Sequence, residues 1–127
     1  MRETIYPFDA AAEYDTAELC HINELLNTDA DPQVSIARAR VAPGVTTRWH
    51  RLRDIAERYV ITEGRGRVEV GDLSAKDVGV GDVVLIPPAC PQRITNIGSA
   101  DLVFLAICTP RFVPHAYEDI ETDGDAV

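Results

Sequence analysis

The sequence predicts an all-β fold, a sandwich or barrel of antiparallel strands. From about Val34 onward, apolar residues recur at alternating positions in short segments, which is the pattern of half-buried strands. Gly, Pro, Asn and Asp separate these segments and supply the backbone angles that turns need. The segments follow one another with almost no helical pattern between them, so the strands are expected to pair mainly with each other.

Seven strands are expected after Val34, each bounded by turn residues. They cover Val34–Val41, Val45–Leu52, Glu57–Thr62, Arg65–Val70, Asp82–Ile86, Gln92–Thr95 and Asp101–Cys108. Before them the pattern is weaker, and residues 10–27 fit either a helical start at Ala10–Glu13 or an edge strand at Cys20–Asn23. We therefore expect an N-terminal arm and edge strand over residues 1–33, a barrel over 34–110 and an acidic tail over 111–127.

The length of the chain limits the number of its domains, and its charge limits the partners that it can bind. Its 127 residues suffice for one domain, and its net charge is −9. Such a charge repels nucleic acid and anionic membranes, so neither is an expected partner. Five of the acids lie in the tail, which is expected to fray from Tyr117 and to be solvated; they are Glu118, Asp119, Glu121, Asp123 and Asp125.

The cysteines and the N-terminus indicate a cytoplasmic protein. Cys20, Cys90 and Cys108 are odd in number and widely spaced, which argues against a disulfide framework and against a cysteine zinc site. The first residues include acids where a signal peptide needs an apolar core. No apolar run approaches the length that spans a membrane.

Two strands bring polar side chains to one place. In a strand over Val45–Leu52, alternation places Arg48 and His50 on one face, and the next strand begins with Glu57 and continues to Tyr59. If these strands are neighbours, His50 and Glu57 converge inside the fold. Such a pair suits either a metal ion or proton transfer.

The spacing of these residues resembles the two conserved motifs of the cupin superfamily. Pro43-Gly44, His50, Glu57 and Gly64 match the first motif, and the second appears as residues 81–87 followed by Gln92 and Asn96. Together the motifs span about half of the chain. The resemblance implies a single-domain jelly-roll barrel with a metal site of two His and one Glu from the first motif and one His from the second.

This sequence departs from that metal site at two positions. Leu52 stands in place of the second His, and Gln92 in place of the His of the second motif. The ligands that carry over are His50, Glu57 and Gln92, and a site of one nitrogen and two oxygens still permits Mn, Fe or Zn. In the alternative, the three side chains form a polar patch that binds an organic ligand directly, and the pair His50 and Glu57 acts as acid and base without a metal.

Arg48, Tyr59 and Gln92 are the candidates for binding a substrate. Arg48 is expected to point into the pocket and hold an anionic substrate group, with an ion pair to an acid as the alternative. Arg38 and Arg40 share one face of their strand, which either lines the cavity or meets solvent. Tyr59 is expected in the pocket wall or in the core.

Two further residues have open roles. Cys108 lies on the face of the last strand that reaches the cavity, and a free buried cysteine usually behaves as a small apolar residue. His115 either folds back over the cavity mouth as a ligand or lies on the surface.

The resemblance implies a small cupin enzyme acting on a small polar, anionic metabolite, with a mononuclear metal or a metal-optional site. His50 would be ligand or base, Glu57 ligand or proton carrier, and Gln92 ligand or substrate clamp. The alternative is a non-enzymatic module that binds a small molecule without metal. A homodimer is expected in both cases, because the N-terminal segment offers an edge strand that would otherwise stand unpaired.

Overall fold

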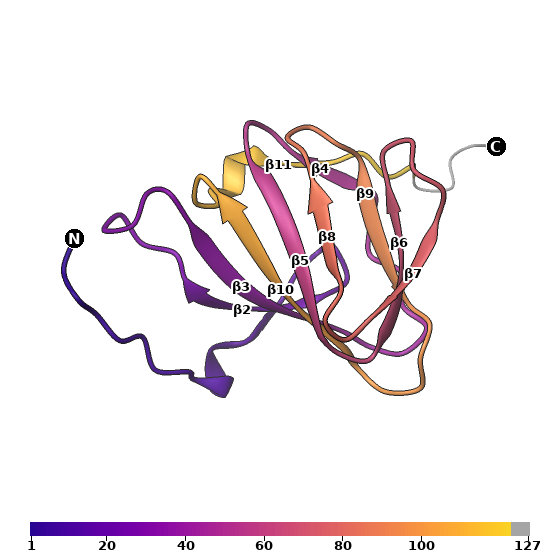
Figure 1. The fold of residues 1–127 in the computed structure, drawn as a ribbon, viewed down its shortest axis with the longest axis horizontal. Helices are drawn as coiled ribbons and strands as arrows, with labels where there is room; N and C mark the ends of the chain where they lie inside the picture. Colours follow the sequence, from indigo (N-terminus) through magenta and orange to yellow (C-terminus); the bar gives the residue numbers. More distant parts are fainter. Residues whose placement is uncertain (123–127) are drawn as a thin grey trace.

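The computed structural model describes residues 1–122 and contains two antiparallel sheets (Figure 1). The six-stranded sheet has the order β1 (Tyr14–Asp15), β2 (His21–Leu26), β3 (Ser35–Val41), β10 (Leu102–Thr109), β5 (Ala56–Glu63) and β8 (Val83–Ile86). The five-stranded sheet has the order β11 (Tyr117–Asp119), β4 (His50–Leu52), β9 (Gln92–Asn96), β6 (Arg65–Val70) and β7 (Lys76–Gly79). Two 3₁₀ turns complete the structure, η1 (Ala10–Ala12) and η2 (Pro114–Ala116).

The two sheets pack on each other through their inward side chains. Ile61 of β5 is 1% exposed and Ile94 of β9 is 0% exposed, and both belong to one apolar cluster that also includes Phe104 of β10. Burial alternates along β5 and β6, as the period of two requires. The prediction of an all-β jelly-roll fold is confirmed.

Most strands lie where alternation predicts them. β6 has the predicted bounds, and β3, β5, β8, β9 and β10 differ from prediction by no more than one residue at either end. In the N-terminal segment a short 3₁₀ turn forms at Ala10–Ala12, and the expected strand forms as β2, which pairs with β3 on one side and β1 on the other and so is not an edge strand. The sheets therefore extend to both sides of residues 34–110.

The strand expected over Val45–Leu52 is shorter in the structure, so its predicted bounds were wrong. Only His50–Leu52 forms β4, and the earlier part contributes a single bridge between Thr46 and Thr95. Thr47 and His50 are both buried although they are three positions apart, so the alternation breaks between them. Arg48 therefore does not share a face with His50.

The chain does not fray at Tyr117, contrary to expectation. Residues 117–119 form β11, which pairs with β4 in antiparallel register. The carboxylate of Glu118 lies 3.2 Å from Arg51, and that of Glu121 accepts a hydrogen bond from the backbone N–H of Trp49 at 2.7 Å. Arginines of the β4 segment thus offset the acids; Asp123 and Asp125 lie outside the described residues.

No helix within residues 1–122 is long and apolar enough to cross a membrane.

Candidate active site

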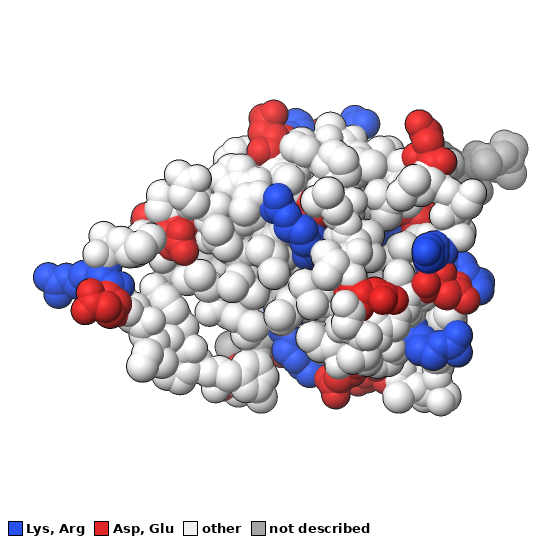
Figure 2. Space-filling view, in the orientation of Figure 1, with Lys and Arg blue, Asp and Glu red and all other residues white. Residues whose placement is uncertain are grey.

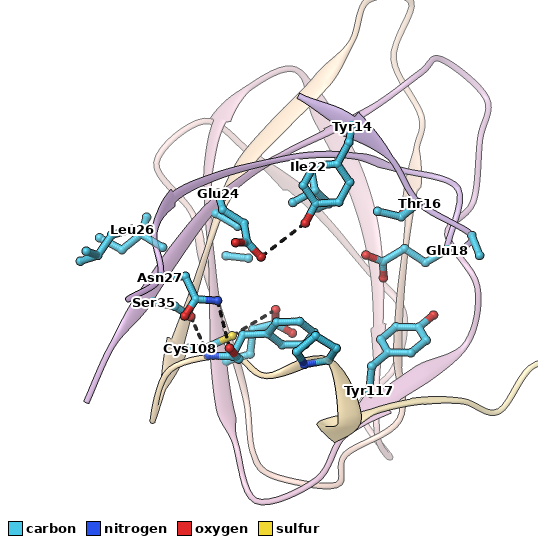
Figure 3. A pocket seen from close by; sticks show the side chains of 17 residues that line it. Tyr14, Thr16, Glu18, Ile22, Glu24, Leu26, Asn27, Ser35, Cys108 and Tyr117 are labelled. Carbon is cyan, nitrogen blue, oxygen red and sulfur yellow. Dashed lines mark hydrogen bonds between the residues drawn. The ribbon is translucent and has the colours of Figure 1, made fainter. Parts of the chain in front are cut away.

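A cavity of about 330 Å³ opens along the six-stranded sheet, between its strands β1 to β3 and the segment that leads into β11 (Figure 3). Its wall combines residues of β1 and β2, the turn between them, the inward face of β3 and β10, and the segment that leads into β11. The lining comprises Tyr14, Thr16, Ala17, Glu18, Ile22, Glu24, Leu26, Asn27, Ser35, Ile36, Ala37, Glu57, Ala106, Cys108, Phe112, Pro114 and Tyr117.

A second pocket of about 70 Å³ adjoins the cavity and reaches deeper between the sheets. The two hollows share six lining residues, among them Glu18, Glu57 and Tyr117. The inner pocket adds His50 and Tyr59. A bound molecule would therefore meet Glu57 from the cavity and His50 from the inner pocket.

Glu57 is the central polar group of the site. Its side chain is 8% exposed, and its Oε1 accepts a hydrogen bond of 2.8 Å from Nε2 of Gln92. The Oε1 of Gln92 in turn accepts a 2.5 Å hydrogen bond from the hydroxyl of Tyr59. Within residues 1–122, the second carboxyl oxygen of Glu57 has only the thiol of Cys108 as a hydrogen-bond partner, at 3.7 Å. This oxygen keeps most of its hydrogen-bonding capacity for a ligand.

Burial is the main cause that raises the pKa of Glu57 above its ordinary value. The amide of Gln92 and the charge of His50 oppose the shift, and the charge of Glu18 adds to it. Burial and the charge of Glu57 raise the pKa of Tyr59 well above the ordinary phenol value. Tyr59 thus remains a donor and fixes the orientation of the Gln92 amide.

His50 lies opposite Gln92 in the pairing of β4 with β9. Its Nδ1 is 2.8 Å from the backbone carbonyl of Arg48, and a carbonyl can only accept, so Nδ1 carries a proton. Its Nε2 lies 3.7 Å from a carboxylate oxygen of Glu18. The ring stacks on Tyr117 with centroids 5.2 Å apart. The orientation leaves Nε2 as the nitrogen that can exchange a proton.

Glu18 is a site residue that sequence reasoning missed. It lies in the turn between β1 and β2, and its backbone carbonyl accepts a 3.1 Å hydrogen bond from the N–H of Arg48. The thiol of Cys20 donates to its Oε1 at 3.3 Å, and Thr16 closes the same turn through the carbonyl of Cys20 at 2.8 Å. No local pattern marks Glu18, because its contact with His50 joins segments far apart in the sequence.

The arginines considered for substrate binding do not line the cavity. Arg48 donates to the carboxylate of Asp119 at 2.6 Å, which is the ion pair that was the alternative to a pocket role. Arg38 and Arg40 both lie within ion-pair distance of Glu13, at 3.6 and 2.6 Å. The charged face of β3 is therefore the one directed away from the cavity.

Cys108 lines the cavity, whereas His115 and His21 lie away from it. Cys108 is buried and lines the cavity as expected, and burial raises the pKa of its thiol, which keeps it protonated. His115 lies exposed on η2, and the hollow beside it contains none of the residues around Glu57. His21 is hydrogen-bonded to Asp15 at the edge of the sheet, in keeping with a structural role.

The residues around Glu57 do not fit a metal ion. Of the four positions that the motifs imply as ligands, Leu52 offers no donor atom, and Gln92 presents its N–H group to Glu57 while its oxygen accepts from Tyr59. Only His50 and Glu57 remain as donors. Within residues 1–122, no group of three or more His, Cys, Asp or Glu side chains is arranged to hold a metal. The motif positions thus supply one imidazole and one carboxylate, fewer than the three or four protein ligands of zinc sites.

The two packed antiparallel sheets and the cavity beside Glu57 define a jelly-roll protein with an internal pocket. Residues 37–108 match the model of the cupin domain, which is more than half of the chain. The chain belongs to the cupin superfamily, as its two motifs indicated.

Two curated relatives are each 35% identical to this chain over the residues that align. An uncharacterized protein of Methanocaldococcus jannaschii is 35% identical over 116 residues, which is 90% of each chain. A glucose-6-phosphate isomerase of Pyrococcus furiosus is 35% identical over 80 residues, which is 60% of this chain and 42% of the isomerase. Among solved structures, the nucleoside dehydratase Pac13 of Streptomyces superposes with a TM-score of 0.74 at 14% identity, covering 93% of this chain and 92% of Pac13. That likeness shows the shared fold.

Proposed function

We propose that this chain is a cupin enzyme that transfers protons to and from a small molecule bound in the cavity, without a metal ion. Glu57 is the acid or base that contacts the substrate, His50 is its partner, and Gln92 and Tyr59 hold Glu57 in place. The single observation that carries the proposal is a nearly buried carboxyl group that lines the cavity with one oxygen bound by Gln92 and the other left for a ligand.

The environment suits a carboxyl group that changes its protonation during a reaction. A raised pKa brings the acid form of Glu57 closer to neutral pH, where transfer in both directions is efficient. The Nε2 of His50, which lines the inner pocket and lies 3.7 Å from Glu18, is positioned to take or return a second proton. Both the isomerase relative and the dehydratase neighbour are named for reactions that rearrange or eliminate, which supports this class of chemistry.

Solvent exchange tests the proposal without knowledge of the substrate. The protein is incubated in D₂O with a panel of small hydroxy, keto and amino compounds, and NMR follows the replacement of C–H by C–D. We expect at least one compound to exchange, at a rate that EDTA leaves unchanged. If purified protein exchanges a compound only after a metal is added and stops with EDTA, the metal-independent proposal is wrong.

The alternative of a non-enzymatic binding module predicts apolar walls with arginine and no perturbed acid. The structure supports the enzyme better, because the residues that line the cavity include no arginine and the pKa of Glu57 is raised. Binding of a compound with no exchange of any proton in the panel would favour the module.

We further propose that the protein is a cytoplasmic homodimer. The three cysteines are free, in keeping with a reducing compartment. On the outer face of the six-stranded sheet, Leu105, Val60 and Val83 form one aliphatic row across β10, β5 and β8, and the next row holds Arg58 between Ile107 and Leu85. Figure 2 shows a Lys or Arg side chain in an otherwise largely uncharged area over these strands. Val83 and Leu85 of the edge strand β8 are each 61% exposed. A two-fold contact would bury these rows against their own copies.

The double variant Val83→Lys with Leu85→Lys tests this dimer. Light scattering of the wild type should give twice the chain mass of 13.9 kDa, and the variant should give one chain mass, because buried lysines oppose association. Leu73→Lys is the matched control, since Leu73 is 74% exposed in the turn before β7 and should leave the dimer intact. A monomeric wild type would refute this interface.

A further inference from the structure

Three carboxylates line the cavity, and within residues 1–122 none of them forms an ion pair with Lys or Arg. Glu24 lies at the exposed mouth, Glu18 has a side chain 19% exposed, and Glu57 lies deepest at 8%. Figure 3 shows the carboxylates of Glu18 and Glu24 pointing toward the same space from opposite walls. None of the residues that line this cavity is Lys or Arg. A molecule in this space therefore meets negative charge on several sides.

By contrast, two glutamates that do not line the cavity form ion pairs with arginines. Glu13 pairs with Arg40 at 2.6 Å, and Glu69 pairs with Arg93 at 2.8 Å. Within residues 1–122, neither Glu18 nor Glu24 forms an ion pair with Lys or Arg; Glu24 accepts only a long 3.4 Å hydrogen bond from Tyr14, and Glu18 has only the imidazole of His50 and the thiol of Cys20. Their charge is thus available to a ligand.

Arg111 contacts a residue that lines the cavity. It donates to Asn27 at 2.9 Å, but its second contact, with Asp29 at 2.8 Å, neutralises it. Arg48, on which an anionic substrate depended, is held by Asp119. Arg48 and Arg111 are therefore both engaged by carboxylates that do not line the cavity.

Aromatic rings complete the lining. Tyr14, Phe112 and Tyr117 contribute to the wall, and the hydroxyl of Tyr117 is buried without a hydrogen-bond partner in the described structure. Ring faces attract cations, and the effect is larger where water is displaced. A carboxylate and an ammonium form a strong charge-assisted hydrogen bond. The cavity, at about 330 Å³, is near the lower end of the usual range of roughly 300–1,000 Å³ for ligand pockets, so the molecule is small.

We propose that the cavity selects a small molecule with a cationic nitrogen, such as a primary ammonium, which lies between Glu18 and Glu24 with its organic part against the aromatic rings. The inference rests on the proposed function in that it names the substrate class of the same site. It replaces the expectation of an anionic metabolite, because the cavity offers carboxylates where an anion would need arginine.

Three probes of similar size and different charge test the proposal: benzylammonium, benzyl alcohol and benzoate. Their dissociation constants are measured by NMR titration at fixed pH and low salt. We expect benzylammonium to bind about tenfold or more tightly than benzoate, with benzyl alcohol between them. Equal or tighter binding of benzoate would overturn the proposal, and so would the absence of binding by all three probes at millimolar concentration.

Matched variants locate the effect. Glu18→Gln and Glu24→Gln should each weaken benzylammonium by about threefold to tenfold and leave benzyl alcohol unchanged. Glu63→Gln is the control, because it removes the same charge from an exposed position outside the cavity. If Glu63→Gln weakens benzylammonium as much as the cavity variants do, the selectivity comes from the net charge and the site is refuted. Charge-selective binding without deuterium exchange would leave this inference standing and remove the proposed function, and exchange of an uncharged or anionic compound would do the reverse.

Discussion

Glu57→Gln should lower the rate of proton exchange by about two to four orders of magnitude, the usual contribution of a general acid or base. The amide has nearly the same shape as the carboxyl group and can still accept from Nε2 of Gln92, but it cannot give or take the proton. The measurement is the initial rate of deuterium incorporation into whichever compound exchanges with the wild type. Cys108→Ser, beside the same carboxyl group, is the control and should retain most of the rate.

The same variant should be more stable than the wild type at neutral and higher pH. The folded pKa of Glu57 is raised above its ordinary value of 4.5, so the folded state holds this proton more tightly than the unfolded state does. Stability contributed by the protonated group is complete below about 4.5 and is lost as pH rises through the folded pKa. Glu57→Gln removes this loss, by about 1.4 kcal/mol for each unit of the shift.

Urea unfolding of the two proteins from pH 4 to pH 9 gives the comparison, since the difference between them isolates Glu57 from other titrating groups. A variant that is folded, more stable and inactive would show that the lost rate is chemical. A variant less stable than the wild type at high pH would contradict a raised pKa, and a fully active variant would remove Glu57 from the reaction.

Gly64→Ala should destabilise the fold by about 3 kcal/mol or more, the largest stability effect that we expect from a single methyl group. Gly64 joins β5 to β6 with φ of +81°, and an added Cβ would lie 2.6 Å from the backbone oxygen of Asp101. Backbone atoms cannot move aside as the end of a side chain can, so strain from the positive φ and a steric clash add together. Urea unfolding measures the change in the free energy of unfolding.

Gly44→Ala separates these two causes. Gly44 has nearly the same φ, +79°, but a Cβ there would meet nothing within 4 Å. We expect a cost of about 1 kcal/mol, which is that of the left-handed conformation alone. Equal losses in the two variants would show that the contact with Asp101 has no role.

The sequence predicted the strands in which burial follows the period of two. β5 and β6 alternate cleanly and were located to within a residue, whereas β7 was missed because Lys76–Gly79 has no alternation. β4 was predicted too long because Thr47 and His50 both turn inward across an irregular segment. Such a change of phase depends on the pairing partner, Thr95, and no local pattern records it.

The sequence predicted site residues only within the segment that the two family motifs span. Glu57, Gln92 and Tyr59 do form one hydrogen-bonded group, and His50 lies in the pocket beside them. The role of Arg48 depended on regular alternation and on an acidic tail that stays in solvent, and the pairing of β11 with β4 removes both conditions. Glu18 could not be found, because only tertiary structure brings it to His50.

The turn between β1 and β2 has a consequence for how this protein can diversify. It delivers Glu18 to the cavity and is anchored by one backbone hydrogen bond to Arg48, while the reactive groups come from strands within the matched cupin domain. Substitutions in the turn can therefore change which molecules bind, while His50 and Glu57, which we propose to transfer protons, stay in place. Related chains could exchange this short loop and acquire new ligands without rebuilding their interior.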